Sequence, residues 1–191
     1  MINLSEKYKS FIWTPNRTGS TLASLVLKNE EFGFELYDEK KVKTSDFYKH
    51  HHYYYFFEGH ENYNFLMTVR NPYNQYLSFM GYRINQDSSD HLERMFQNEE
   101  HRLFMLKLKQ RKPDYVLRIE NLYEDYCKIP FIEDSNFNKS GDLKKLIDSK
   151  PNQLKQKPDF QFNQQIADLI YYNNLVIFDM FGYEKDSWKK L

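Results

Sequence analysis

The stretch FIWTPNRTGSTLASLVL, residues 11–27, decides the fold that this sequence predicts. It opens with a short apolar, aromatic-rich run, as a buried strand does, and Pro15 interrupts that run. From Leu22 to Leu27 the apolar residues have the spacing of a helix with one apolar face. The stretch therefore predicts a strand, a tight turn rich in small residues, and the start of a helix.

The predicted turn has the composition of an anion-binding site. The first N–H groups of a helix have no intrahelical partners, and the helix dipole places partial positive charge at the same end. Gly19 allows the backbone to approach an oxyanion closely. Ser20 and Thr21 add hydroxyl donors, and Arg17 adds a planar cation. The turn is not a Walker A loop, because Ser20 stands where that loop has its lysine; a surface turn with a helix cap is the structural alternative.

Length and composition indicate a globular protein without a bias in charge. Its 191 residues suffice for one domain with a core of its own, which we expect to span residues 1–191. Lys plus Arg and Asp plus Glu both number 27, which argues against nucleic-acid binding by net charge. Cys127 is the only cysteine, no apolar leader opens the sequence, and no run is long enough to cross a membrane. We therefore expect a cytoplasmic protein with no nucleic-acid partner and no membrane span.

Apolar runs and helical patterns alternate along the chain. The predicted strands are residues 9–13, 63–69 and 115–119, and a helical pattern follows each of them. This alternation favours an α/β fold, for which we expect three layers, α/β/α, with a central parallel sheet. The other expected segments are a polar edge at 1–9, an extended segment at 44–57, helices at 88–110, 121–128, 142–149 and 163–181, and a loop at 131–141. In the helix 88–110 the residues expected to face inward are Leu92, Met95, Phe96, Leu103 and Leu106.

A second anion-binding element is predicted at the end of the strand 63–69. Asn71 is a good N-cap and Pro72 suits the first helical position, so a helix begins directly after this strand. Arg70 stands at the carboxyl end of the strand, where open α/β sheets bind ligands. Ser78 lies on a polar stripe of the helix. A structural ion pair of Arg70 and a surface hydroxyl at Ser78 are the alternatives.

The two elements, TPNRTGST at residues 14–21 and RNPYNQYLS at residues 70–78, together resemble the sulfotransferase family that uses 3′-phosphoadenylyl sulfate (PAPS). In that family a P-loop-like turn holds the 5′-phosphosulfate, and an R-x-P motif with a following serine holds the 3′-phosphate. RIENLYED at residues 118–125 and DMFGYEKD at residues 179–186 are similar to endings found in the carbohydrate and protein-tyrosine branches. The resemblance covers most of the chain and implies the P-loop NTPase-like sulfotransferase fold.

The resemblance also implies an enzyme, which transfers a sulfuryl group from PAPS to a hydroxyl acceptor and leaves adenosine 3′,5′-bisphosphate. A sugar is the favoured acceptor. In-line transfer of this kind rests on positioning and electrostatic stabilisation, and no metal is part of the scheme. Arg17 would stabilise charge on the leaving phosphate. The cofactor-binding residues that the resemblance implies are Arg17, Thr18, Gly19, Ser20, Thr21, Arg70 and Ser78.

The family places its base, a His or a Glu, between the two cofactor motifs. This interval contains an internal histidine run, in which an extended backbone would point His50 and His52 to the same face. A base His of the carbohydrate branch lies on a similar segment, so the resemblance assigns proton abstraction to His52, for which an imidazole is suited near neutral pH. A packing role or a metal site is open to the same run. The alternative bases are His50, His51, Glu58, His60 and Glu61.

Two short segments allow both a functional and a structural interpretation. Asn138-Lys139-Ser140 resembles an N-x-S segment that reaches the cofactor in relatives, and a local structural role is equally open. For Glu120 and Asn121 we expect capping of the helix that follows.

Two other functions stay open. A P-loop kinase or nucleotide hydrolase with a degenerate loop would turn over ATP with magnesium, although the Walker lysine is absent. A non-catalytic nucleotide-binding module would bind the cofactor without transfer. The acceptor of a sulfotransferase could also be a protein tyrosine, a lipid or a phenol.

Overall fold

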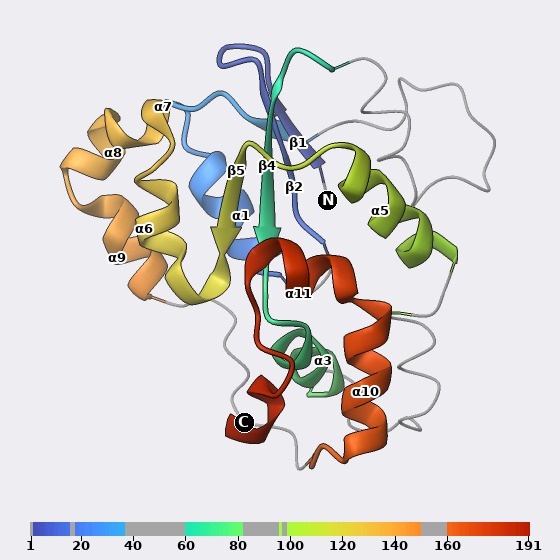
Figure 1. The fold of residues 1–191 in the computed structure, drawn as a ribbon. Helices are drawn as coiled ribbons and strands as arrows, with labels where there is room; N and C mark the ends of the chain where they lie inside the picture. Colours follow the sequence, from blue (N-terminus) through green and yellow to red (C-terminus); the bar gives the residue numbers. More distant parts are fainter. Residues whose placement is uncertain (1, 16–17, 37–59, 82–95, 97–98, 150–159) are drawn as a thin grey trace. The chain divides into compact units, whose positions relative to one another are not determined.

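The computed structural model describes residues 2–15, 18–36, 60–81, 96, 99–149 and 160–191 (Figure 1). They belong to two compact units, each built from two separate segments of the chain. Unit 1 spans residues 1–69 and 113–152 and contains the sheet, whereas unit 2 spans residues 70–112 and 153–191 and is helical. The expected segment at 44–57 and most of residues 88–98 lie outside the described residues.

Unit 1 is organised around a five-stranded mixed sheet with the strand order β3-β1-β2-β4-β5 (Figure 1). β2, β4 and β5 run parallel, and β1 pairs antiparallel with both β2 and β3. Trp13 lies opposite Met67, and Val69 lies opposite Arg118, so the carboxyl ends of the parallel strands share one edge of the sheet. The strands are β1 (Ile2–Ser5), β2 (Ser10–Trp13), β3 (Glu35–Leu36), β4 (Asn64–Val69) and β5 (Tyr115–Arg118).

The α/β class and the three predicted strands are confirmed, but the sheet is not parallel throughout. Residues 1–9 were expected to be a polar edge segment, yet they form β1 and a turn that returns the chain as β2. Lys9 adopts a positive φ of 44° in this turn. An antiparallel pair needs only a short turn, whereas a parallel pair needs a long crossover, so the segment directly before β2 can pair with it only as a hairpin.

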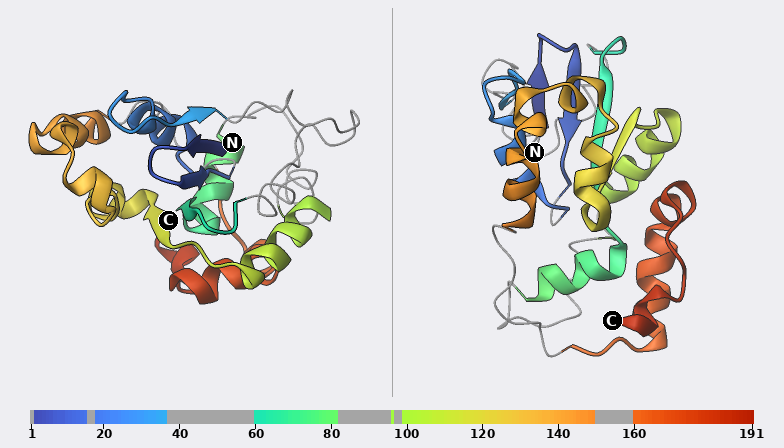
Figure 2. Two further views of the ribbon diagram at one scale, coloured as in Figure 1. Left: turned by 90° about the horizontal axis from the view of Figure 1, so that it is seen from above. Right: turned by 90° about the vertical axis from the view of Figure 1, so that its left-hand side faces the viewer.

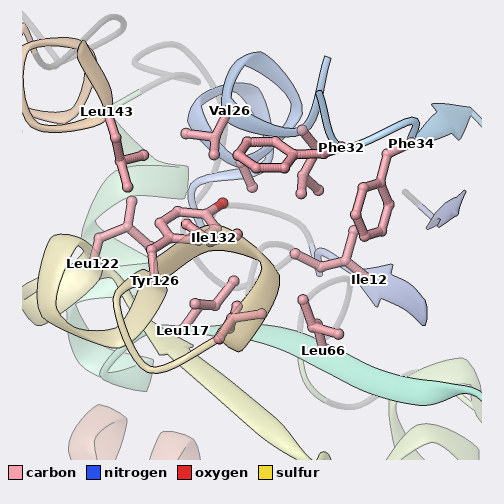
Figure 3. Packing of buried hydrophobic residues seen from close by; sticks show 13 residues of the cluster. Ile12, Val26, Phe32, Phe34, Leu66, Leu117, Leu122, Tyr126, Ile132 and Leu143 are labelled. Atoms are coloured by element: carbon pink, nitrogen blue, oxygen red, sulfur yellow. The ribbon is translucent and has the colours of Figure 1, made fainter. Parts of the chain in front are cut away.

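The helices of unit 1 cover one face of the sheet with their apolar sides. Figure 3 shows Ile12, Leu66 and Leu117 of the strands beside Val26 and Tyr126 of the helices, and all five side chains are fully buried. Burial of these side chains is the main favourable contribution to folding of this unit. The helices are α1 (Ser20–Leu27), η4 (Ile119–Asn121), α6 (Leu122–Tyr126), α7 (Pro130–Glu133), α8 (Asn136–Lys139) and α9 (Asp142–Asp148).

The loop predicted at residues 131–141 is wrong, because this stretch holds most of α7 and all of α8. Pro130 occupies the first turn of α7, where its missing N–H costs no hydrogen bond. Ser135 caps α8, since its Oγ accepts a 3.1 Å hydrogen bond from the Asn138 N–H. Both start signals are present in the sequence, but each helix is only four residues long and shows no periodicity.

Unit 2 is a helical assembly around an aromatic core, and Figure 2 shows its main helices in two further views. Tyr73 and Tyr76 of α3 are fully buried, and the Tyr73 ring packs edge-on against Phe162 and Phe178. Asn71 caps α3 as predicted, because its Oδ1 accepts from the Tyr73 N–H at 3.0 Å. The helices are α3 (Pro72–Met80), α5 (Glu99–Gln110), α10 (Gln164–Asn173), α11 (Leu175–Phe181) and η5 (Ser187–Lys190).

The inward face predicted for the helix 88–110 is confirmed at Phe96, which is buried, and is wrong within α5; Leu92 and Met95 lie outside the described residues. Leu103 and Leu106 are 39% and 56% exposed, and the buried face is instead formed by Phe104, Met105 and Leu108. Apolar residues are nearly continuous from 103 to 108, so periodicity alone permits either face, and the larger Phe104 decides the orientation.

The helix predicted at 163–181 is interrupted at Asn174, which separates α10 from α11. Its buried side chain donates a 2.8 Å hydrogen bond to the Ile170 carbonyl oxygen. An asparagine side chain competes for backbone partners in this way, which favours helix ends over helix interiors.

Candidate functional site

The turn between β2 and α1 leaves the sheet at the edge where the parallel strands end. Thr18 in this turn is only 3% exposed. Its Oγ1 donates to the Pro15 carbonyl oxygen at 2.7 Å and lies 2.7 Å from Oγ1 of Thr68 in β4. A threonine hydroxyl has a single proton, so the Thr68 hydroxyl is the donor in the second bond. Thr18 is therefore held both to Pro15 and to the neighbouring strand.

Gly19 is required in this turn for two reasons. Its φ is +78°, a conformation that side chains with a Cβ rarely adopt. A Cβ at this position would overlap Cδ1 of Ile119, the residue after β5, so the end of that side chain would have to shift. The Gly19 carbonyl then accepts a 2.9 Å hydrogen bond from the Ala23 N–H, within the first turn of α1. The turn is thus in contact with residues at the ends of both β4 and β5.

The start of α1 has the electrostatic character of an anion site. The first N–H groups of a helix carry partial positive charge and are free to bind a ligand. No acidic residue lies in the first turn of α1 that would compensate this charge. Thr21 is exposed at this end. Phosphate and sulfate groups are typical ligands of such a helix start.

The structure brings four of the predicted site residues together in unit 1, namely Thr18, Gly19, Ser20 and Thr21. Thr18 uses both its hydroxyl and its N–H, the latter at 3.3 Å, on the Pro15 carbonyl, so the role that its contacts support is to hold the turn. Arg17 lies outside the described residues. The same is true of His52 and of the alternative bases His50, His51 and Glu58.

Two alternative bases lie at the wrong edge of the sheet for this site. His60 and Glu61 precede the amino end of β4, and the His60 ring packs edge-on against Tyr63 at 4.9 Å. The six residues of β4 separate them from the edge where the turn lies. At about 3.3 Å per residue that separation is roughly 20 Å, too far for a base to reach an acceptor bound at the turn.

Arg70 and Ser78 belong to unit 2. Arg70 directly follows β4 in the chain and is half-buried, and Ser78 lies half-buried near the end of α3. Two contacts with the C-terminal segment fix α3 in this unit. The Tyr73 hydroxyl donates to the Lys185 carbonyl at 2.7 Å, and the Asn71 side chain donates to Ser187 Oγ at 2.8 Å. The start of the helix after Arg70 is thereby held in one orientation within unit 2.

Burial dominates the electrostatics of the two tyrosines on α3. Burial, and to a lesser extent the carboxylates of Asp168 and Asp186, raises the pKa of Tyr73 well above its ordinary value. Burial alone raises the pKa of Tyr76 to about 12. Both rings stay neutral at physiological pH, so they act as core side chains and not as proton acceptors.

The segment RIENLYED forms the corner between β5 and α6. Asp125 has a side chain that is 1% exposed, and its Oδ2 accepts a 2.9 Å hydrogen bond from the Arg118 N–H. The Arg118 guanidinium lies 3.4 Å from the same oxygen, and Lys128 also pairs with this carboxylate. Asn121 was expected to cap α6, but its side chain makes no cap hydrogen bond. The corner is instead held by the hydrogen bond from the Arg118 N–H to Asp125. Ile119, the next residue, lies close to Gly19.

The segment Asn138-Lys139-Ser140 has local structural contacts. The Asn138 amide donates to the Glu133 carbonyl at 3.2 Å, and its Oδ1 accepts from the Tyr123 hydroxyl at 3.4 Å. Ser140 Oγ donates to Asp142 Oδ2 at 2.7 Å. These bonds stabilise the turns between α7, α8 and α9.

Sequence analysis missed two residues that define the turn. Thr68 stands alone as a polar residue in the second half of a buried strand, and that isolated hydroxyl is the signal that could have identified it. Ile119 gives no signal, because nothing in the sequence distinguishes an isoleucine that contacts a distant glycine from any other isoleucine.

Comparison with known proteins yields no relative. No family model matches the chain, and neither a curated protein nor a solved structure is significantly similar to it. None of the helices that the structure describes has the length and apolar character needed to cross a membrane. Within the same described ranges, no group of three or more His, Cys, Asp or Glu side chains is arranged to hold a metal ion.

Proposed function

We propose that this protein is a PAPS-dependent sulfotransferase that transfers a sulfuryl group to a hydroxyl acceptor, with a sugar favoured. The observation that carries the proposal is the turn between β2 and α1. It lies at the carboxyl edge of the parallel strands, has Gly19 at a φ of +78°, and leads into a helix start without an acidic residue. Such a turn fits an anionic phosphosulfate group, and the sequence of the turn resembles that of the family.

The residues of the turn would hold the 5′-phosphosulfate of the cofactor. The N–H groups at the start of α1 and the hydroxyls of Ser20 and Thr21 supply hydrogen bonds to it. Arg17 supplies a permanent positive charge that stabilises the leaving phosphate, because a guanidinium stays protonated at every physiological pH. Thr18 contributes by holding the turn against β4.

Arg70 and Ser78 would bind the 3′-phosphate. A dianion is bound best by charge-assisted hydrogen bonds, which an arginine and a hydroxyl can both donate. His52 takes the proton of the acceptor hydroxyl, for which a neutral imidazole with a pKa near 6.5 is suited. In this proposal the α/β fold is the three-layer, P-loop NTPase-like sulfotransferase fold.

Calorimetry with adenosine 3′,5′-bisphosphate, AMP and ATP tests the proposal. We expect the bisphosphate to bind far more tightly than AMP, because only the bisphosphate carries the group that Arg70 and Ser78 would recognise. Loss of a buried charge-assisted contact costs about 2–5 kcal/mol, so Arg70→Ala should weaken bisphosphate binding by about 30-fold or more and leave AMP binding nearly unchanged.

Arg102→Ala is the matched control, because Arg102 is an exposed arginine on α5 of the same unit. We expect it to bind the bisphosphate as the unchanged protein does. If Arg70→Ala weakens the binding of the bisphosphate and of AMP equally, Arg70 does not recognise the 3′-phosphate. Preferential binding of ATP with magnesium-dependent turnover would instead favour a nucleotide kinase or hydrolase.

A further inference from the structure

Thr68 is a buried hydroxyl in a strand whose neighbouring residues are apolar. It is 0% exposed, and Met67 and Val69 on either side of it are 1% exposed. A buried hydroxyl must find a partner to offset its lost hydration. Here the partner is Oγ1 of Thr18, at 2.7 Å, fifty residues away in the sequence. The bond therefore connects β4 to the turn before α1.

The direction of the two hydroxyl bonds gives each threonine a distinct role. Thr18 donates its proton to the Pro15 carbonyl and closes the turn. Thr68 donates to Thr18 and fixes the closed turn to the sheet. Thr18 is bonded directly to Gly19, whose backbone lies so close to the Ile119 side chain that an added Cβ would force the end of that side chain to shift. The position of Thr18 consequently fixes where α1 starts.

We infer that Thr68 is a positioning residue for the anion-binding turn: its hydroxyl holds Thr18, and through Thr18 it aims the first N–H groups of α1. The ligand part of this inference rests on the proposed function, whereas the part about the turn rests on the contacts of Thr68. The Thr68 hydroxyl is satisfied within the protein and does not contact the ligand. Binding of an anion at this turn depends on it because donors must be held in place before the ligand arrives.

Amide hydrogen exchange of the unliganded protein tests the positioning directly. In Thr68→Val the shape of the side chain is kept and the donor is lost. Within residues 18–21 the reporter is the Thr18 amide, which is hydrogen-bonded to the Pro15 carbonyl, and we expect it to exchange faster by about fivefold, the equivalent of one net hydrogen bond. Thr68→Ser keeps a hydroxyl and should restore slow exchange. Unchanged exchange at residues 18–21 in Thr68→Val would overturn the inference.

Ser135→Ala is the matched control. Ser135 is 3% exposed, lies in the same unit and uses its hydroxyl to cap α8 and to bond the Ile132 carbonyl at 2.6 Å. Its loss should lower stability to a similar extent, yet the additional exchange should appear around α8 and not at residues 18–21. Faster exchange of residues 18–21 in this control as well would show that the effect in Thr68→Val reflects global stability alone.

Binding of adenosine 3′,5′-bisphosphate supplies the second measurement. We expect Thr68→Val to weaken binding by about fivefold or more, with Thr68→Ser and Ser135→Ala close to the unchanged protein. If exchange responds at residues 18–21 and no variant, nor the unchanged protein, binds the bisphosphate, the proposed function fails and the positioning of the turn stands. If the bisphosphate binds equally to all variants, Thr68 does not position the ligand donors.

Discussion

Replacing Gly19 by alanine tests the geometry on which the candidate site depends. The substitution adds one methyl group to a residue with a φ of +78°, and this methyl would overlap Cδ1 of Ile119 unless that side chain moves. Two separate costs follow, one from the backbone conformation and one from the contact. Substitutions at Ile119 and at Gly141 allow the two costs to be measured separately.

The expected magnitude is the sum of these costs. A left-handed conformation with a Cβ costs about 1–2 kcal/mol. Ile119 is half-buried and only the end of its side chain must move, so its displacement from a preferred rotamer costs about 0.5–1.5 kcal/mol. We therefore expect Gly19→Ala to lower the free energy of unfolding by about 1.5–3.5 kcal/mol. Ile119→Val deletes Cδ1, and the next atom, Cγ1, is 3.4 Å from the added methyl, close to an ordinary contact.

The assay is urea unfolding of the four proteins of the double-mutant cycle, followed by the fluorescence of the buried Trp13 in β2. Ile119→Val alone should cost about 0.5–1.5 kcal/mol. In the double variant the contact is relieved and the backbone cost stays, so the double variant should be more stable than the sum of the single changes predicts by about 0.5–1.5 kcal/mol.

Gly141→Ala is the matched control for the backbone cost. Gly141 has a φ of +80° and no atom within 4 Å of the position of a Cβ. It should lose only the backbone part, about 1–2 kcal/mol, with no coupling to Ile119→Val. A Gly19→Ala protein no less stable than Gly141→Ala, or one that Ile119→Val does not relieve, would refute the close packing of the turn against β5.

Three further predictions concern catalysis, the core and pH. His52→Ala should lower sulfuryl transfer by about 10²–10⁴-fold and Arg17→Ala by about 10²–10³-fold, with bisphosphate binding retained in His52→Ala; full activity in either variant would contradict its role. The Tyr126 hydroxyl is buried without a hydrogen-bond partner among the described residues, so Tyr126→Phe should raise the free energy of unfolding by about 1 kcal/mol in urea titrations, and a loss of that size would disprove this. Burial lowers the pKa of His101 below 6.5, so on acidification the unfolded chain takes up a proton before the folded protein does. The free energy of unfolding should therefore fall as the pH drops below 6.5, and it should fall less in His101→Phe. Equal pH profiles of the two proteins would contradict this prediction.

The parts of the fold that the sequence predicts correctly are those with local causes. Asn71 and Pro72 start α3 because a side-chain cap and a fixed φ act within one turn of helix. The apolar run before Pro15 forms β2 because a short apolar segment between breaks is buried on both faces. Neither result depends on distant residues, so the signal is complete in the local sequence.

The parts that the sequence did not predict depend on distant residues. The orientation of α5 depends on which of its two apolar faces packs against the rest of unit 2. The sequence of residues 103–108 is compatible with either face being buried. β1 forms because β2 offers a free edge for a hairpin, although its own sequence is short and half polar. The bond between Thr18 and Thr68 joins the turn before α1 to a strand fifty residues later, so no local pattern contains it.

The candidate site also combines features that the local sequence predicts with features that depend on packing. Within unit 1, the first motif follows β2 and the third begins at Arg118, the last residue of β5. β4 lies between these two strands and is parallel to both, so the two motifs leave the sheet at the same edge. A sequence in which polar segments repeatedly follow buried strands therefore predicts a common site at that edge. The residues that hold the edge together, Thr68 and Ile119, belong to the strands and their ends, and only the packed structure identifies them.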